Sequence, residues 1–169
     1  MQIAELVDDD GVLVLASAQR LEARFGHRDF DYGFPKELVA AAADEVLCTW
    51  QSHAEGRVVI AVAAPEGDRS ADAVLLGVVR LERDDDLLLL PYSQFTMACD
   101  YLGGVPEEIE GLQARLEFPA GRYAVSVRPA GGGASGPAGE VVHRCEVHLA
   151  AAGPADMPLS DVPVVEPWT

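Results

Sequence analysis

Basic side chains are scarce in this chain of 169 residues: 12 lysines and arginines stand against 28 aspartates and glutamates. The formal net charge at pH 7 is therefore -16. Nucleic acid phosphates and anionic membranes repel a surface of this sign, so direct binding to either is not expected. The same charge speeds the encounter with a basic protein. Charge thus narrows the choice of partners, although it says nothing about the fold.

Long apolar runs are also missing. None reaches the roughly 18 residues of a membrane-spanning helix, and the longest, such as residues 12–16 and 58–64, have the length of strands. The first residues lack the basic and apolar regions of a signal peptide. We therefore expect a cytoplasmic protein. Apolar residues make up 49% of the chain, enough for a sizeable core.

Sequence signatures of catalysis are absent as well. The chain contains no GxSxG nucleophile elbow, and its run of three glycines at 131–133 lacks the lysine of a phosphate-binding loop. Its three cysteines, Cys48, Cys99 and Cys145, form no CxxC pair, so we interpret them as reduced core residues. We predict no catalytic residue and no cofactor, and we do not expect an enzyme.

Short apolar or alternating segments, separated by turns, dominate what is present. Residues 12–16 are apolar throughout, which is typical of a strand buried on both faces, and the alternation of Leu21, Ala23 and Phe25 with charged residues predicts that this strand continues. Residues 91–97 fit either a strand or a crossover. The predicted strands are residues 12–25, 46–50, 57–64, 73–81, 87–90, 112–118, 123–128 and 140–149.

One helix is predicted over about residues 35–46, because Leu38, Ala42 and Val46 recur at helical spacing after Pro35. Residues 112–118 and 123–128 alternate on either side of a turn and predict a hairpin. The fold class is therefore mostly β: a two-layer antiparallel β-sandwich of about eight strands with one α-helix. We expect this domain to span residues 1–150, followed by a proline-rich extended tail over 151–169 that Trp168 could anchor.

Metal binding is not expected from the histidines. His143 and Cys145 share one face of the last predicted strand and His148 lies on the other, whereas a metal site needs three or four converging ligands. The acidic turns at 8–10 and 84–86 leave calcium open as an alternative at the loop end of the sandwich. Their consecutive aspartates point in different directions, however, and no EF-hand spacing is present. We interpret such turns as solvated ends of strands.

Acidic clusters in turn-like, hydrophilic sequence are better suited to a protein partner than to an active site. An acid/base pair normally lies in a cleft with apolar walls. We therefore predict that the clusters bind a basic protein. The predicted partner-binding residues are Asp29, Asp31, Asp84, Asp85, Asp86, Glu107, Glu108 and Glu110.

The order of elements resembles the competence protein J family. An acidic, aromatic loop (Asp29-Phe30-Asp31-Tyr32-Gly33) leads into an alanine-rich helix, then come an aromatic-bearing strand and an apolar strand, and last the sequence Leu-Glu-Phe-Pro-Ala-Gly-Arg-Tyr at 116–123. The resemblance covers about residues 11–128, with insertions near 95–110. It implies a β-rich inhibitor or immunity-type protein that binds a nuclease or toxin, since the family's described member inhibits a DNA-entry nuclease.

Three hypotheses follow. The first is a non-enzymatic acidic protein that blocks a basic partner, such as a nuclease or toxin, through its acidic loops, with or without self-association. The alternative is a β-sandwich that binds calcium or a small ligand at its loop end. A small enzyme using His143 or His148 with a nearby carboxylate ranks last.

Overall fold

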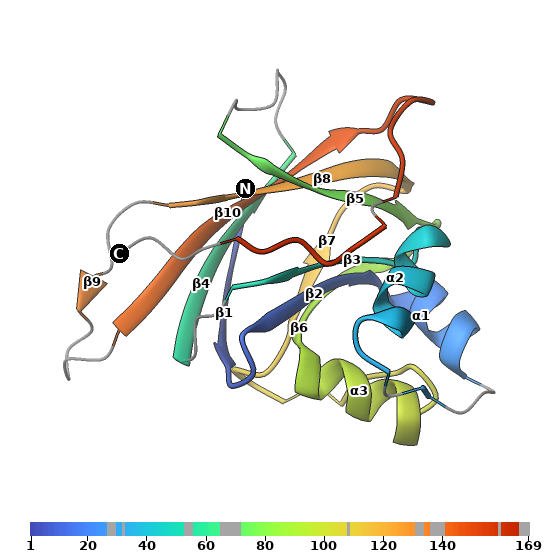
Figure 1. The fold of residues 1–169 in the computed structure, drawn as a ribbon, viewed down its shortest axis with the longest axis horizontal. Coiled ribbons are helices and arrows are strands. Elements are labelled where there is room, and N and C mark those ends of the chain that lie inside the picture. Colours follow the sequence, from blue (N-terminus) through green and yellow to red (C-terminus); the bar gives the residue numbers. More distant parts are fainter. Residues whose placement is uncertain are drawn as a thin grey trace.

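The computed structural model describes residues 1–26, 30–31, 33–52, 56–64, 72–107, 109–130, 134–135, 141–158 and 160–165. They form two packed β-sheets, and three short helices lie against the outer face of the smaller sheet (Figure 1). The strands are β1 (Gln2–Asp8), β2 (Val12–Ser17), β3 (Leu47–Gln51), β4 (Gly56–Ala63), β5 (Val74–Leu81), β6 (Asp86–Pro91), β7 (Ala114–Glu117), β8 (Gly121–Pro129), β9 (Ala134–Ser135) and β10 (Val141–Ala151). The helices are α1 (Ala18–Phe25), α2 (Lys36–Ala43) and α3 (Tyr92–Tyr101).

The larger sheet has the order β1-β4-β10-β8-β5, with β9 paired to β10, and the smaller sheet has the order β3-β2-β6-β7. The predicted mostly β, two-layer sandwich is confirmed. One pair departs from the prediction: β10 runs parallel to β4, whereas the other paired strands are antiparallel. Alternation along a strand shows which face is buried but not the direction of its neighbour, so the sequence could not reveal this exception.

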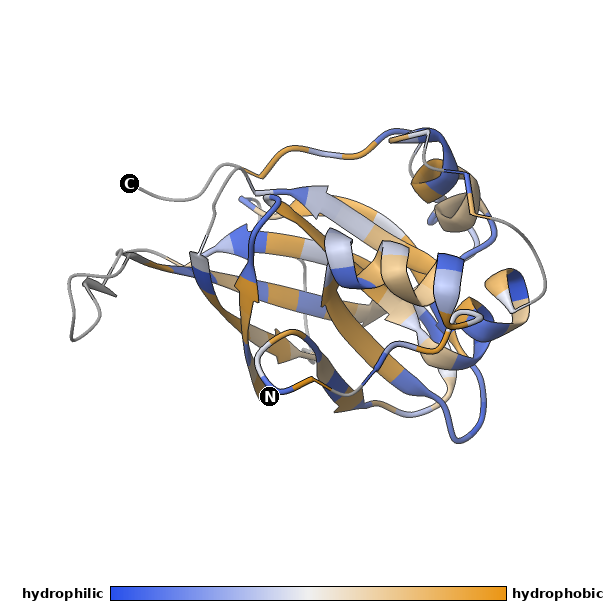
Figure 2. Cartoon of the chain, turned by 90° about the horizontal axis from the view of Figure 1, so that it is seen from below, coloured by the Kyte–Doolittle hydropathy of each residue, from blue (hydrophilic) through white to orange (hydrophobic). Residues whose placement is uncertain are grey.

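Three strands of the smaller sheet, β2, β3 and β6, are buried on both faces. Leu13 and Leu15 of β2 point into the core between the sheets, and Val14 and Ala16 point into a second core beneath the helices. This explains why β2 is apolar at every position, as the sequence predicted. Apolar residues line most of the strands, whereas hydrophilic residues gather at the turns (Figure 2).

Two of the three helices were mispredicted. The segment after Ser17, predicted as a strand, is α1: Leu21 and Phe25 lie on its buried side, and the Ser17 hydroxyl accepts a hydrogen bond from the Arg20 N–H at 3.1 Å. Such a serine cap stabilises a helix start. Residues 91–97 were predicted as a strand or a crossover, and residues 92–101 form α3. The helix predicted at 35–46 is confirmed as α2, with Leu38 buried.

The predicted hairpin is also wrong. β7 pairs with β6 in the smaller sheet, whereas β8 pairs with β5 and β10 in the larger one. The turn at 118–120 therefore carries the chain from one layer to the other. Leu116 and Val125 both reach the core between the sheets, so each strand shows the alternation of a half-buried strand without being the other's partner. The first strand, β1, was not predicted.

The chain after β10 packs back onto the sandwich. Gln51 of β3 exchanges backbone hydrogen bonds with Pro163 and Val165, at 2.9 and 2.8 Å. Val162 and Val165 are buried, one in each core. Trp168 and the glycines at 131–133 lie outside the described residues. In the part of the chain that the structure describes, the helices are too short and too polar to cross a membrane.

Candidate partner-binding surface

The 84–86 turn (Asp84, Asp85 and Asp86) joins β5 to β6 beside α1. Asp85 is buried and accepts hydrogen bonds from the Ser17 hydroxyl at 2.5 Å and from the backbone N–H groups of Gln19 and Glu82 at 3.0 and 3.2 Å. Its carboxylate satisfies donors at the first turn of α1, where a negative charge is favourable. Asp85, predicted to bind a partner, is therefore occupied in the fold.

Asp84 and Asp86 face outward on either side of this buried carboxylate. Asp84 is exposed and has a positive φ of 59°, a left-handed conformation that aspartate tolerates better than most residues. Asp86 is half-buried and forms an ion pair of 3.0 Å with Arg115 of β7. The turn thus presents two carboxylates outward from a rigid base.

Two hollows flank the 84–86 turn, so that the turn forms a ridge between them. The first, of about 210 Å³, is bounded by α1, the turn and the chain after α3, and Glu22, Val105 and Pro106 contribute to its lining. The second, of about 410 Å³, lies towards β7 and is lined in part by Glu117 and Phe118. Each hollow combines carboxylates with an apolar wall and one arginine, Arg115 in the first and Arg83 in the second. The carboxylates outnumber the arginine in each, which suits the aliphatic stem and charged head of a lysine or arginine side chain.

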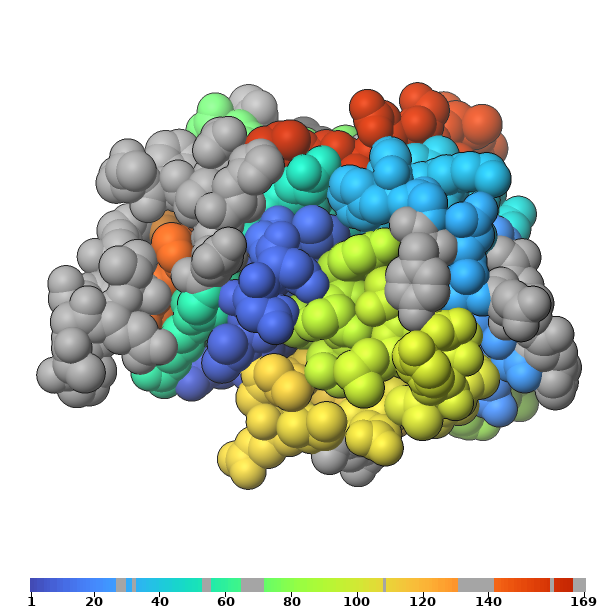
Figure 3. All heavy atoms as spheres, turned by 60° about the horizontal axis from the view of Figure 1, so that its bottom comes forward, coloured from blue at the N-terminus to red at the C-terminus, as the bar shows by residue number. Residues whose placement is uncertain are grey.

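The loop after α3 brings a second predicted cluster to this ridge. Glu107 is exposed and follows Pro106, which lines the first hollow. Glu110 is exposed farther along the loop, next to Gly111, whose carbonyl accepts a hydrogen bond of 2.7 Å from the N–H of Val7. Figure 3 shows this loop (yellow) beside α3 (yellow-green) on one face of the molecule. Glu108 is outside the described residues.

Asp31 is held separately, at the approach to α2. It is exposed and accepts hydrogen bonds from the N–H of Gly33 at 3.0 Å and from the ammonium of Lys36 at 3.2 Å. The Gly33 N–H and then Lys36 lower the pKa of this carboxyl. These local bonds give Asp31 a role in shaping the loop, and it does not line the two hollows beside the 84–86 turn. Asp29 is outside the described residues.

The 8–10 turn, which the calcium alternative invoked, is built differently from a solvated strand end. Asp8 is buried, and it accepts hydrogen bonds from the N–H groups of Asp10 and Gly11 at 3.3 and 3.1 Å. Asp10 accepts from the N–H of Ser93 at 2.7 Å, and Asp9 accepts from the Ser93 hydroxyl at 3.0 Å. The carboxylates lie within 4.8 Å of one another, but they bind the turn to the first residues of α3.

Burial raises the pKa of Asp8 to about 7. An aspartate in water has lost its proton well below this pH, and a carboxyl removed from water holds it longer because the charged form loses its hydration. The interpretation of the 8–10 turn as a solvated end is thus wrong for Asp8. Asp9 and Asp10 remain exposed.

The residues considered for metal binding on β10 do not converge. Cys145 packs against the core between the sheets, and burial raises its pKa to about 12. His148 lies on the opposite face of the strand, with its Nε2 3.5 Å from a carboxylate oxygen of Glu146. The pKa of buried Cys48 is also raised by burial. These environments agree with the interpretation of the cysteines as reduced core residues.

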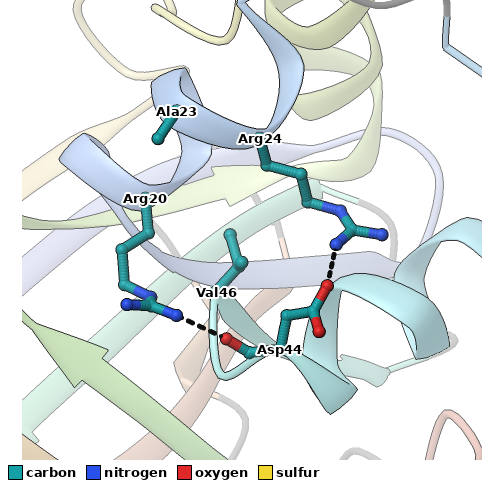
Figure 4. Close-up of a pocket in the computed structure, with 5 residues that line it drawn as sticks. All are labelled: Arg20, Ala23, Arg24, Asp44 and Val46. Carbon is teal, nitrogen blue, oxygen red and sulfur yellow. Dashed lines mark hydrogen bonds and ion pairs between the residues drawn. The ribbon is translucent and has the colours of Figure 1, made fainter.

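Arginines of α1 are engaged within the fold. A hollow of about 410 Å³ lies between α1 and the end of α2 (Figure 4). Across it, Arg20 donates to the backbone carbonyl of Asp44 at 2.7 Å, and Arg24 pairs with the carboxylates of Asp44 and Glu37. These bonds tie the two helices together. Glu45 likewise pairs with Arg80 at 3.0 Å and with Arg122 at 2.7 Å.

The acidic surplus is concentrated in one stretch of chain. Between Arg83 and Arg115 the sequence holds seven acidic residues and no lysine, arginine or histidine. This stretch contains the outward carboxylates of the 84–86 turn, all of α3 and the loop with Glu107 and Glu110. Sequence reasoning identified the clusters but missed Glu22, because α1 was not recognised, and Glu117, because the pairing of β7 with β6 was not predicted. The signal was available: Ser17 precedes Ala18, Leu21 and Phe25, spaced as on one side of a helix.

Comparison with solved structures identifies the architecture. Over 90% of this chain and 96% of the other, the structure superposes with a TM-score of 0.50 and 8% identity on ComJ from Bacillus subtilis, described as an inhibitor of the DNA degrading activity of NucA. The chain has the ComJ fold. A second match, described as crocagin biosynthetic gene J, has a TM-score of 0.49 and 12% identity over 90% of this chain and 98% of the other.

No protein-family model matches the chain, and no curated protein sequence matches it either. The order of the elements in the sequence resembles the competence protein J family, and the superposition on ComJ shows the same resemblance in the fold. At 8% identity the match with ComJ concerns the fold, and the residues of the acidic ridge have to be judged on their own geometry.

Proposed function

We propose that the protein is a non-enzymatic inhibitor that binds a basic protein, of the nuclease-inhibitor or toxin-immunity type, through the ridge of the 84–86 turn and the loop after α3. The observation that carries the proposal is that the loop after α3 borders the hollow beside the 84–86 turn. Asp84 and Asp86 line this hollow, Val105 and Pro106 give it an apolar wall, and the exposed Glu107 follows Pro106 directly in the chain.

The physical case is one of competition with DNA. A nuclease needs basic side chains to hold the phosphate backbone, and an acidic surface can occupy those side chains in place of the phosphates. Attraction between opposite charges also accelerates association, and salt weakens it. ComJ, which shares this fold, is described as an inhibitor of NucA, so a nuclease is the first partner to test.

The test measures DNA cleavage by purified NucA, and by basic nucleases encoded next to this gene, with increasing amounts of the protein. We expect inhibition of at least one of them, with an association rate that falls as salt rises from 50 to 300 mM. Reversal of two ridge charges, Asp84→Lys with Glu107→Lys, should weaken inhibition at least tenfold.

Asp161→Lys is the control, because Asp161 is an exposed aspartate in the C-terminal segment that lines neither hollow beside the 84–86 turn. Equal inhibition by both variants would remove the ridge from the proposal. A full panel without inhibition or binding would overturn the function itself. The protein alone should not retain labelled duplex DNA at 150 mM salt, and retention would contradict a purely protein-directed role.

A further inference from the structure

Exposed apolar side chains gather on α3 and the loop that follows it. Met97 and Tyr101 are 45% and 74% exposed, and Val105 and Ile109 are 46% and 37% exposed. These four residues are called the α3 patch below. They are four of the ten large apolar side chains that the described part of the chain exposes, although they span a short stretch of it. Exposed apolar groups that cluster in this way are typical of interaction sites.

The patch is carried by a firmly anchored helix. Phe95, Ala98 and Cys99 bury the inner side of α3, and Ser93 at its start is bound by the 8–10 turn. Its end is closed by the N–H of Gly104, which donates to the carbonyl of Ala98 at 2.8 Å. Met97 and Tyr101 lie one helical turn apart, so their side chains are neighbours on the outer side. Little ordering is therefore needed when a partner binds.

Acidic residues lie at both ends of the α3 patch. Asp9 and Asp10 lie at the start of α3, and Glu107 and Glu110 lie in the loop beyond its end. Figure 3 shows the N-terminal turn (blue), α3 (yellow-green) and the loop (yellow) side by side on one face. An apolar centre within a charged rim is the usual arrangement of a protein–protein interface, in which a few aromatic or methionine side chains supply most of the affinity.

The charge of the rim selects the occupant. A second copy of this chain would bring two rims of the same sign together, each on a molecule of net charge -16, and an anionic membrane would be repelled likewise. A basic protein surface with apolar side chains at its centre complements both the rim and the patch. Opposite charges at the rim and buried apolar area at the centre would both favour binding of such a surface.

We propose that the α3 patch is the apolar centre of the surface that docks a basic protein, with Tyr101 and Met97 as its main anchors. This inference rests on the proposed function, since the occupant is the inhibited partner. It adds separate roles for charged and apolar residues. The carboxylates of the 84–86 turn and of the residues beside α3 govern the association rate, and the α3 patch governs the lifetime of the complex.

The test uses full-length protein and the same nuclease panel, with NucA first, and measures association and dissociation rates at 50 and 300 mM salt. Tyr101→Ala and Met97→Ala should each raise the dissociation rate at least tenfold and leave the salt dependence of association unchanged. Met157→Ala is the control, because Met157 is an exposed methionine (66%) elsewhere on the chain. It should behave as the unmodified protein.

Each other outcome counts against the proposal. If a nuclease is inhibited but the Tyr101 and Met97 variants match the Met157 control, the α3 patch is not the centre of the interface, although the proposed function stands. If no nuclease in the panel binds, the proposed function and this inference fail together. Sedimentation provides an independent check: a dimer that forms at 1 M salt and is lost in Tyr101→Ala would assign the patch to a second copy.

Discussion

The 8–10 turn and the 84–86 turn have the same sequence, three consecutive aspartates, but their carboxylates have different roles. Each buries one carboxylate, Asp8 or Asp85, and each supports the first residues of a helix. In the 8–10 turn the two remaining carboxylates also bind residues of the fold, through Ser93. In the 84–86 turn, Asp86 pairs with Arg115, and Asp84 and Asp86 both line the two hollows. The comparison shows that a run of like charges becomes structural or exposed according to the backbone donors within its reach.

The largest expected effect is on stability, from removal of Asp85. Asp85→Ala leaves the N–H groups of Gln19 and Glu82 and the Ser17 hydroxyl without their acceptor. We expect a loss of about 2–3 kcal/mol in the free energy of unfolding, since each bond to a carboxylate contributes on the order of 1.5–3 kcal/mol and water replaces part of it. Urea denaturation measures this. Asp84→Asn is the neighbouring control, because asparagine also tolerates the left-handed conformation at this position, and it should change stability by less than about 0.5 kcal/mol.

The second prediction concerns pH and Asp8. Because burial raises the pKa of Asp8 to about 7, the folded protein holds a proton there that the unfolded chain has already lost. Between about pH 4 and 7 this group therefore makes stability fall as pH rises, by at most about 1.4 kcal/mol per pH unit, and above pH 7 its effect is constant. Asp8→Asn should flatten the dependence of unfolding free energy on pH across this window. An unchanged profile in the variant would contradict the assignment.

The third prediction separates charge from stability at the 84–86 turn. Arg115→Gln removes the cation that faces Asp86 across a partly exposed pair, so stability should fall by no more than about 1 kcal/mol. The ridge becomes more negative, and association with an inhibited basic nuclease should become faster at 50 mM salt. Arg128→Gln, which breaks the pair with Glu146 on the larger sheet, is the control and should leave the rate nearly unchanged.

The smallest effect is expected from calcium. The carboxylates of the 8–10 turn already accept hydrogen bonds from the backbone and from Ser93. We therefore expect calcium from 0 to 5 mM to leave the melting temperature within about 1 °C, because an ion that prefers the folded state would raise it. A rise of several degrees that Asp9→Asn abolishes would favour the calcium alternative.

Much of the sheet structure could be predicted from the sequence, because buried positions of a strand or helix are occupied by apolar residues. β2 is apolar at all positions because both of its faces are covered, and α2 shows its stripe at Leu38 and Ala42. In short amphipathic segments, the same pattern of apolar and polar residues can fit either a helix or a strand. In α1 the residues Leu21, Ala23 and Phe25 fit a period of two, and the capping by Ser17, which decides for a helix, depends on a single hydroxyl.

The candidate surface was predictable in part. The clusters at 84–86 and 107–110 are visible in the sequence, but their meeting depends on how the chain after α3 returns past α1, which no local pattern records. Nor could the sequence distinguish Asp85 from Asp84, because which of the three consecutive carboxylates turns inward depends on the donors of α1. The α3 patch escaped notice for a related reason: Met97 and Tyr101 become neighbours only once residues 92–101 are helical.

The segment that pairs with Gln51 has a consequence for how this protein meets others. Unpaired strand edges are the places where sheets recruit foreign strands, in binding and in aggregation. By pairing Pro163 and Val165 with Gln51 and burying Val162 and Val165, the chain covers the Gln51 end of this edge with its own residues. At that end of β3 a partner therefore has to recognise side chains rather than continue the sheet.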